Sequence, residues 1–130
     1  MKPDSLDHLV LTVRNLDAAT GFYEDVLGME IIAFGTGRKA LKAGRQKINL
    51  HVAGMEFEPK ASRPTPGSAD LCLLIAGPLS EALAELVAKQ VSLVEGPVRR
   101  TGATGPIESV YVREPDGNLI ELSAPVPGTA

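Results

Sequence analysis

Several residue types are scarce in this chain of 130 residues, and each scarcity excludes a class of protein. The single cysteine, Cys72, cannot form an internal disulfide, so a disulfide-stabilised scaffold is excluded. Tryptophan is absent and aromatic residues make up only 4%, which argues against a base-stacking platform for single-stranded nucleic acid. The net charge of −3 gives no field that would attract a nucleic-acid backbone or an anionic membrane surface. No apolar run is long enough for a signal peptide or a membrane span, so we expect a cytoplasmic protein without nucleic-acid or membrane partners.

What the chain does contain fits one globular domain over residues 1–130. Hydrophobic residues make up 44% and charged residues 22%, both ordinary values for a packed soluble domain. A chain of this length can bury one sizeable core but has no room for two independent domains.

The first part of the domain, about residues 5–52, has the pattern of a βαβββ module. The alternating apolar residues of 6–13 predict a strand, and the helical spacing that follows predicts a helix with a C-terminal glycine at Gly28. Three short strands are predicted after it, separated by glycine-containing turns, at 29–34, 38–43 and 46–52.

The second part, about residues 69–124, repeats the same order. A strand is predicted at 69–75 and an amphipathic helix at 79–90. Three further strands are predicted at 92–100, 107–113 and 118–124. Residues 53–68 contain three prolines and no periodicity, which indicates a linker between the modules. The fold class predicted is α+β, with two βαβββ modules forming a curved, barrel-like mixed sheet and the helices outside.

Each predicted strand has one apolar face and one polar face, because side chains alternate along a strand. We expect the apolar faces to lie beneath the helices. The opposite faces contain both histidines of the chain, His8 and His51, and the carboxylates Asp70 and Glu121. Two histidines and a carboxylate are typical ligands of a catalytic divalent metal, because neutral imidazole and ionised carboxylate both donate a lone pair. Neighbouring side chains or water could satisfy the same groups instead, and His51 could simply be exposed at its strand end.

Other residues with chemical potential have a functional and a structural interpretation. Cys72 is interpreted as a small core residue rather than a nucleophile, because no basic partner lies near it in the sequence. The glycine-rich segment 101–105 lacks the strand, lysine and helix context of a phosphate loop and is interpreted as the flexible lip of a pocket. Residues that could line a substrate pocket, and in the case of the cations select an anionic substrate, are Lys47, Arg99, Arg100, Tyr111 and Arg113.

The two ends of the chain resemble a known family. The segment LDHLVLTVRNLDAATGFYEDVLGME resembles the opening of the vicinal oxygen chelate superfamily, and EPDGNLIELS resembles its last hairpin, whose glutamate is a metal ligand. That superfamily includes glyoxalase I, methylmalonyl-CoA epimerase, extradiol dioxygenases, and the fosfomycin and bleomycin resistance proteins. The segments RKAL, QKINLH, EFEPKA and GPVRRTGATGPI are similar to one subgroup, the short glyoxalase domain-containing proteins.

The resemblance implies a set of metal ligands. In the superfamily, four positions can bind metal, on the first and the last strand of each module, and His8 and Glu121 match two of them. The other two depart from the usual pattern. Asn49 stands where glyoxalase I enzymes have glutamate, with His51 two residues further on the same face, and Asp70 stands where many members have histidine or glutamine. The implied ligands of a divalent ion, whether zinc, nickel, manganese or iron, are His8, His51 and Glu121, with Asp70 and Asn49 as alternatives.

The resemblance also implies a function. It favours a metal-dependent lyase or isomerase, similar to lactoylglutathione lyase, that acts on a small oxygenated substrate with Glu121 as the catalytic base. Two alternatives stay open, a non-catalytic binding protein of the bleomycin resistance type and an iron-dependent extradiol dioxygenase. Because superfamily barrels are often completed by a second chain, a homodimer is also expected.

Overall fold

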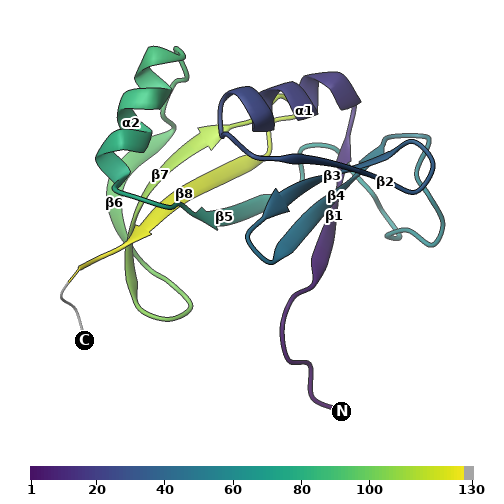
Figure 1. Ribbon diagram of the computed structural model, residues 1–130, viewed down its shortest axis with the longest axis horizontal. Coiled ribbons are helices and arrows are strands. Elements are labelled where there is room, and N and C mark those ends of the chain that lie inside the picture. Colours follow the sequence, from purple (N-terminus) through teal and green to yellow (C-terminus); the bar gives the residue numbers. More distant parts are fainter. Residues whose placement is uncertain (128–130) are drawn as a thin grey trace. The chain divides into compact units, whose positions relative to one another are not determined.

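The computed structural model describes residues 1–127, so the last three positions of the predicted 1–130 domain lie outside the described residues. Its secondary structure confirms the predicted order of a βαβββ module used twice (Figure 1). The elements are β1 (His8–Val13), α1 (Leu16–Asp25), β2 (Ile31–Phe34), β3 (Arg38–Ala43), β4 (Gln46–Val52), β5 (Asp70–Leu74), α2 (Leu79–Ala88), β6 (Glu95–Thr101), β7 (Pro106–Arg113) and β8 (Leu119–Pro125). Residues 53–68 contain neither helix nor strand.

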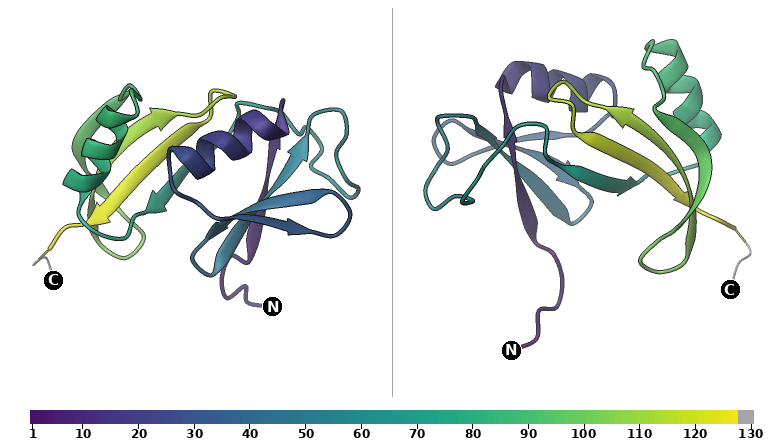
Figure 2. Two further views of the ribbon diagram at one scale, coloured as in Figure 1. Left: turned by 45° about the horizontal axis from the view of Figure 1, so that its top comes forward. Right: turned by 180° about the vertical axis from the view of Figure 1, so that it is seen from behind.

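The chain divides into two compact units, which are described separately. Unit 1 is Met1–Ser68, and unit 2 begins at Ala69. Each contains one helix and one open, curved sheet of four strands rather than a closed barrel (Figure 2). Neither helix among the described residues has the length and apolar character needed to cross a membrane.

In unit 1 the strands lie in the order β1-β4-β3-β2, with β1 parallel to β4 and the other pairs antiparallel. The side chain of Asn15 caps α1 by accepting a hydrogen bond of 2.8 Å from the amide of Ala18. After the helix, Gly28 adopts φ 67°, a left-handed conformation that glycine takes without a steric penalty. These two local signals set the bounds of α1 and return the chain to the sheet.

In unit 2 the order is β5-β8-β7-β6, again with one parallel pair, β5 and β8. The turn before β8 is built around the carboxylate of Glu114, which accepts hydrogen bonds from the amides of Asp116 at 2.7 Å and Asn118 at 2.9 Å. The side-chain oxygen of Asn118 then accepts a hydrogen bond of 2.8 Å from the amide of Ala69. This contact holds the start of β5 beside the start of β8.

The predicted apolar strand faces form the cores of the two units. In unit 1 the buried apolar residues include Leu11, Val13, Ile48 and Leu50 from the strands and Ala19 and Tyr23 from α1. In unit 2 they include Ile120, Leu122, Val110 and Val112 from the strands and Leu79 and Leu86 from α2. Because these side chains occupy the helix-covered face, the opposite face of each sheet carries the polar residues that could have a function.

Candidate functional site

The first and last strands of each unit pair in the same register, so residues of β1–β4 have equivalents in β5–β8. In unit 1, His8 lies opposite Lys47, and Asn49 lies two pairs further along, opposite Val10. In unit 2, Asp70 lies opposite Leu119, and Glu121 lies two pairs further along, opposite Cys72. His8 therefore corresponds to Asp70, and Asn49 corresponds to Glu121. The first and last strands of each unit thus present one equivalent pair of polar side chains on the face away from the helix.

Glu121 is held by hydroxyl groups of its own unit. Its Oε2 accepts a hydrogen bond of 2.6 Å from the Oγ of Ser109 and one of 3.3 Å from the Oγ of Ser123. The two serine hydroxyls are 2.6 Å apart, and the sulfur of Cys72 lies 3.2 Å from the Oγ of Ser123. Both serines are fully buried, so the carboxylate is fixed through one oxygen while Oε1 receives no hydrogen bond from the described residues.

Glu121 also lines a pocket of about 580 Å³ that is formed within unit 2. The other lining residues come from β5, β6, β7, the end of β8 and the turn 101–105, and they include Cys72, Leu74, Arg100, Ile107 and Pro125. The glycine-rich turn 101–105 therefore lines a pocket, as its interpretation as the lip of a pocket implies. Its backbone closes tightly, because the amide of Gly102 donates to the carbonyl of Gly105 over 2.8 Å and a Cβ on Gly102 would lie 2.7 Å from that oxygen.

The prediction that Cys72 is a core residue is wrong. Cys72 is exposed, because it sits on the polar face of β5, an edge strand with a partner on one side only. Desolvation raises the pKa of its thiol, the nearby carboxylates of Glu121 and Asp70 raise it further, and the hydrogen bond with Ser123 opposes this rise. A thiol with a raised pKa is protonated near neutral pH, so this environment does not make Cys72 an activated nucleophile.

Arg100, Tyr111 and Arg113 were predicted to line a substrate pocket, and the structure gives them different partners. In unit 2 the Nε of Arg100 donates to the hydroxyl of Tyr111 over 2.9 Å, and its Nη2 lies 3.4 Å from the carboxylate of Glu95. The hydrogen bond to Tyr111 is the largest cause that raises the pKa of Arg100. Arg113 donates instead to the carbonyl of Gly117 at 3.2 Å, in the turn before β8. Arg100 is thus the one of these three that lines the pocket.

His8 has a partner that the strand pattern did not identify. Its Nδ1 lies 2.8 Å from a carboxylate oxygen of Asp7, and the two side chains are 44% and 92% exposed. A carboxylate on Nδ1 favours the tautomer in which Nε2 has a free lone pair, the arrangement common in metal-bound histidines. An acidic residue next to a histidine is a weak signal by itself, because neighbours along a strand normally point to opposite faces.

His51 is buried, with 3% of its surface exposed, and its surroundings differ from those of His8. Its Nε2 lies 3.4 Å from the Nη2 of Arg38, and its ring makes an edge contact with Phe57 at 5.7 Å between centroids. Burial and then the positive charge of Arg38 lower the pKa of His51, while Glu56 partly opposes them. The imidazole is therefore neutral near pH 7.

The structure does not bring the two histidines together. His51 pairs with Thr12, which lies four positions along β1 from His8. At the rise of a strand, the Cα atoms of His8 and Thr12 are roughly 13 Å apart. Two imidazoles on one zinc-type ion need their ligating nitrogens within about 4 Å of each other, given metal–nitrogen distances near 2 Å. In unit 1, the side chain whose register corresponds to Glu121 is that of Asn49.

The side-chain oxygen of Asn49 is placed as expected for an atom that binds a cation. Asn49 is 5% exposed, and its buried Oδ1 has no hydrogen-bond partner in the part of the chain that the structure describes. Buried polar atoms are nearly always paired, and an amide oxygen can ligate a divalent cation. Within residues 1–127, neither unit gathers three His, Cys, Asp or Glu side chains closely enough to hold a metal ion.

Comparison with known proteins identifies the class. The model of the Glyoxalase/Bleomycin resistance protein/Dioxygenase superfamily matches residues 5–122. The chain belongs to this superfamily, which confirms the family resemblance seen in its sequence.

Particular relatives are similar over most of the chain. Virulence protein STM3117 from Salmonella typhimurium is 58% identical over 120 residues, covering 92% of this chain and 83% of the relative. The glyoxalase domain-containing protein RDO1 of Mycosarcoma maydis is 57% identical over 120 residues, covering 92% of this chain and 68% of RDO1.

Two solved structures place the fold. The crystal structure of STM3117 superposes with a TM-score of 0.94 at 57% identity and covers 97% of this chain and 100% of its own. Lactoylglutathione lyase from Agrobacterium tumefaciens superposes with a TM-score of 0.72 at 25% identity and covers 95% of each chain. Both units of this chain are therefore parts of a glyoxalase-type fold.

Proposed function

We propose that the protein is a divalent-metal-dependent lyase or isomerase of the glyoxalase type that acts on a small oxygenated substrate. We propose as metal ligands two equivalent pairs of residues, each defined by the register within its own unit: His8 and Asn49 on β1–β4 of unit 1, and Asp70 and Glu121 on β5–β8 of unit 2. His51 was included in the ligand set implied by the sequence. We leave it out of the proposed set because it lies four positions from His8 and contacts Arg38.

The observation that carries this proposal is the geometry of Glu121. Its carboxylate lines the unit 2 pocket and is anchored through Oε2 by Ser109 at 2.6 Å. One anchored oxygen limits rotation of the carboxylate, and Oε1 is left to act as a metal ligand or a base. The unpartnered Oδ1 of Asn49 and the carboxylate beside Nδ1 of His8 support the same interpretation in unit 1.

The chemistry follows from these residues. A bound divalent cation would polarise two adjacent oxygens of the substrate and so stabilise negative charge that develops on them. Glu121 removes a proton from the substrate carbon next to a carbonyl and returns it to the neighbouring carbon. Ser109 and Ser123 keep the carboxylate in position during this transfer. Asp7 keeps the ring of His8 in the tautomer that leaves Nε2 unprotonated.

Metal content of the purified full chain tests the proposal. We expect about one divalent ion per site in the wild type after dialysis, measured by elemental analysis, and loss of most of that ion in Glu121→Gln and in His8→Ala. The matched control is Glu108→Gln, which removes the same charge from an exposed residue of β7 on the opposite face. Unchanged metal content in Glu121→Gln, or equal loss in Glu108→Gln, would overturn the proposed site.

The identity of the metal and a substrate assay then separate the reaction classes. With zinc, nickel or manganese bound, we expect turnover of lactoylglutathione, the compound named in lactoylglutathione lyase, or of another small oxygenated compound, and loss of turnover in Glu121→Gln. Bound iron with oxygen consumption on catechols would replace the lyase by a ring-cleaving dioxygenase. A wild type that binds no metal at all would replace it by a non-catalytic binding protein.

We further propose that the chain forms a homodimer. Strands β1 and β5 are edge strands of their sheets, and each carries an exposed apolar side chain, Val10 on β1 and Leu74 on β5. Light scattering coupled to gel filtration should then give about twice the chain mass of 13.7 kDa. A mass of one chain at micromolar concentration would contradict the dimer.

A further inference from the structure

A group of cations and aromatic rings gathers on the polar face of unit 1. The guanidinium carbon of Arg38 lies 4.8 Å from the ring centroid of Phe34 and 4.6 Å from that of Phe57. The ammonium of Lys47 lies 3.7 Å from the centroid of Phe34. The register of β2, β3 and β4 places Phe34 opposite Arg38 and brings Lys47 onto the same face. We call these four residues the Arg38–Lys47 cluster.

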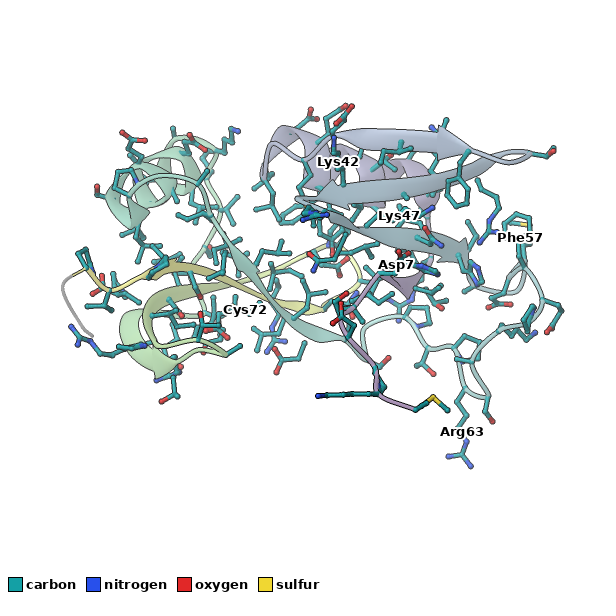
Figure 3. The ribbon with its side chains drawn as sticks, turned by 60° about the horizontal axis from the view of Figure 1, so that its bottom comes forward. Asp7, Lys42, Lys47, Phe57, Arg63 and Cys72 are labelled. Carbon is teal, nitrogen blue, oxygen red and sulfur yellow. The ribbon has the colours of Figure 1, made fainter. Side chains whose placement is uncertain are left out.

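No carboxylate among residues 1–127 forms an ion pair with either cation of this cluster. The neighbouring Lys42, opposite Lys47 on β3, is paired with Glu30 at 3.6 Å, and Figure 3 labels both lysines on this unit. Glu56, the acid that acts on His51, is already used by the amide of Gly54 at 3.0 Å and by Lys60 at 3.9 Å. The cluster therefore carries positive charge that its own unit does not neutralise.

The hydrogen-bonding capacity of Arg38 is also unfilled. Its Nε is buried and finds no hydrogen-bond partner among the described residues, and the contact of Nη2 with His51 at 3.4 Å is long. The two rings contact the faces of the guanidinium and stabilise its charge. They accept no hydrogen bond from the N–H groups that point outward in its plane. A buried charged donor without an acceptor is costly, so this arrangement is expected where an anion completes it.

We propose that the Arg38–Lys47 cluster is an oxyanion subsite that binds the carboxylate or phosphate group of a small organic molecule. The planar edge of Arg38 donates to two oxygens, Lys47 neutralises the remaining charge, and Phe34 and Phe57 contact the apolar part of the ligand. The proposal does not rest on the metal chemistry of Glu121, because all four residues belong to unit 1 and none is a proposed metal ligand.

The test uses the full chain stripped of metal with a chelator, and it uses inorganic phosphate and acetate as probes. The Nε–H resonance of Arg38 is followed by NMR while each probe is added at constant ionic strength. We expect a saturable shift of this resonance with at least one probe. Saturation by acetate alone indicates a carboxylate ligand and saturation by phosphate alone indicates a phosphate ligand, and both outcomes support the subsite.

Two variants and a control identify the residues. Lys47→Met should weaken binding by about tenfold, since a charge-assisted contact contributes about 1.4 kcal/mol or more. Arg38→Gln should abolish it, as followed by the other shifted resonances. Lys42→Met removes the same charge from the same face of the sheet but from a residue already paired with Glu30, and it should change binding less than about twofold.

Two results would overturn the proposal. One is the lack of a saturable shift in the wild type with either probe. The other is an equal loss of affinity in Lys42→Met and Lys47→Met, which would show a general effect of surface charge. If Arg38→Gln does not fold, the comparison of the two lysine variants still decides the matter. Because no metal is present, failure here and failure of the proposed metal site are separate results.

Discussion

The hydroxyl of Ser109 donates a hydrogen bond of 2.6 Å to Oε2 of Glu121, and both residues lie on the polar face of the unit 2 sheet. The register of β7 and β8 creates this contact by placing Ser109 opposite Ser123, two residues from Glu121. Because Ser109 is fully buried, its hydroxyl has little freedom to choose another acceptor. Ser109 is therefore a positioning residue for the carboxylate.

Replacing Ser109 with alanine should weaken divalent-metal binding without unfolding the protein. Loss of a partner behind a ligand typically lowers metal affinity about tenfold or more, and loss of a neutral hydrogen bond destabilises a fold by about 1 kcal/mol. Calorimetric titration with zinc and a thermal melt measure the two effects. Ser92→Ala, at an exposed position of the same unit, is the control and should change neither. Equal zinc affinity in Ser109→Ala and wild type would contradict the positioning role.

The two histidines should differ in their effect on metal binding. His8→Ala should remove most of the bound ion, whereas His51→Ala should retain it, because the register separates His51 from His8 by four positions. Asn49→Ala should lower metal affinity, since its unpartnered Oδ1 occupies the position that corresponds to Glu121. Elemental analysis of the three dialysed variants gives the result. Metal loss in His51→Ala equal to that in His8→Ala would restore His51 as a ligand.

His51 should make the stability of the protein depend on pH. Its pKa in the fold is lowered from 6.5, first by burial and then by Arg38, so the unfolded chain binds more protons than the folded one below that pH. The free energy of unfolding should therefore fall as pH drops from about 6.5 toward the lower folded pKa, by at most about 1.4 kcal/mol per pH unit for one proton.

Urea denaturation of wild type and His51→Gln between pH 7.5 and 5.5 isolates this contribution as the difference between the two proteins. NMR titration of the imidazole in Arg38→Gln provides a second measurement, and the pKa of His51 should be higher there than in wild type. A His51 pKa that does not change when Arg38 is replaced would show that the charge of Arg38 has no influence on it.

Cys72 should react slowly with alkylating reagents although it is exposed. Desolvation and the carboxylates of Glu121 and Asp70 raise its pKa, so less thiolate is present than in an unstructured thiol at the same pH. The rate of modification by iodoacetamide as a function of pH, compared with the urea-unfolded chain, measures this shift. In Ser123→Ala, which lacks the hydrogen bond that lowers the pKa, the midpoint should move further up. A folded chain that reacts faster than the unfolded one would contradict the raised pKa.

The sequence predicted the elements well because its signals are local. The strands at 38–43 and 46–52 were predicted at the bounds observed, since glycine-containing turns mark their ends. The alternation of β1, β4 and β8 also predicted which side chains share the polar face. Cys72 was misplaced because a small apolar residue in a strand gives no sign of whether its strand lies at the edge of the sheet.

The role of Arg38 could not be predicted in the same way. Nothing in the segment RKAL indicates that this arginine lies between Phe34 and Phe57, one from the preceding strand and one from the connection after β4. The unpartnered Oδ1 of Asn49 is equally invisible in the sequence, because it is a property of every atom that surrounds the amide.

By itself the sequence determined the repeated βαβββ order, the superfamily and the face on which His8, Asn49, Asp70 and Glu121 lie. It could do so because a period of two assigns faces, and caps and turns assign ends, from neighbouring residues alone. Only the tertiary structure decided which of these residues are neighbours, since the registers of β1–β4 and β5–β8 join segments far apart in the chain. Those long-range pairings separate the two histidines and place two serine hydroxyls against the carboxylate of Glu121. Among residues 1–127 they also leave Arg38 and Lys47 without a carboxylate partner.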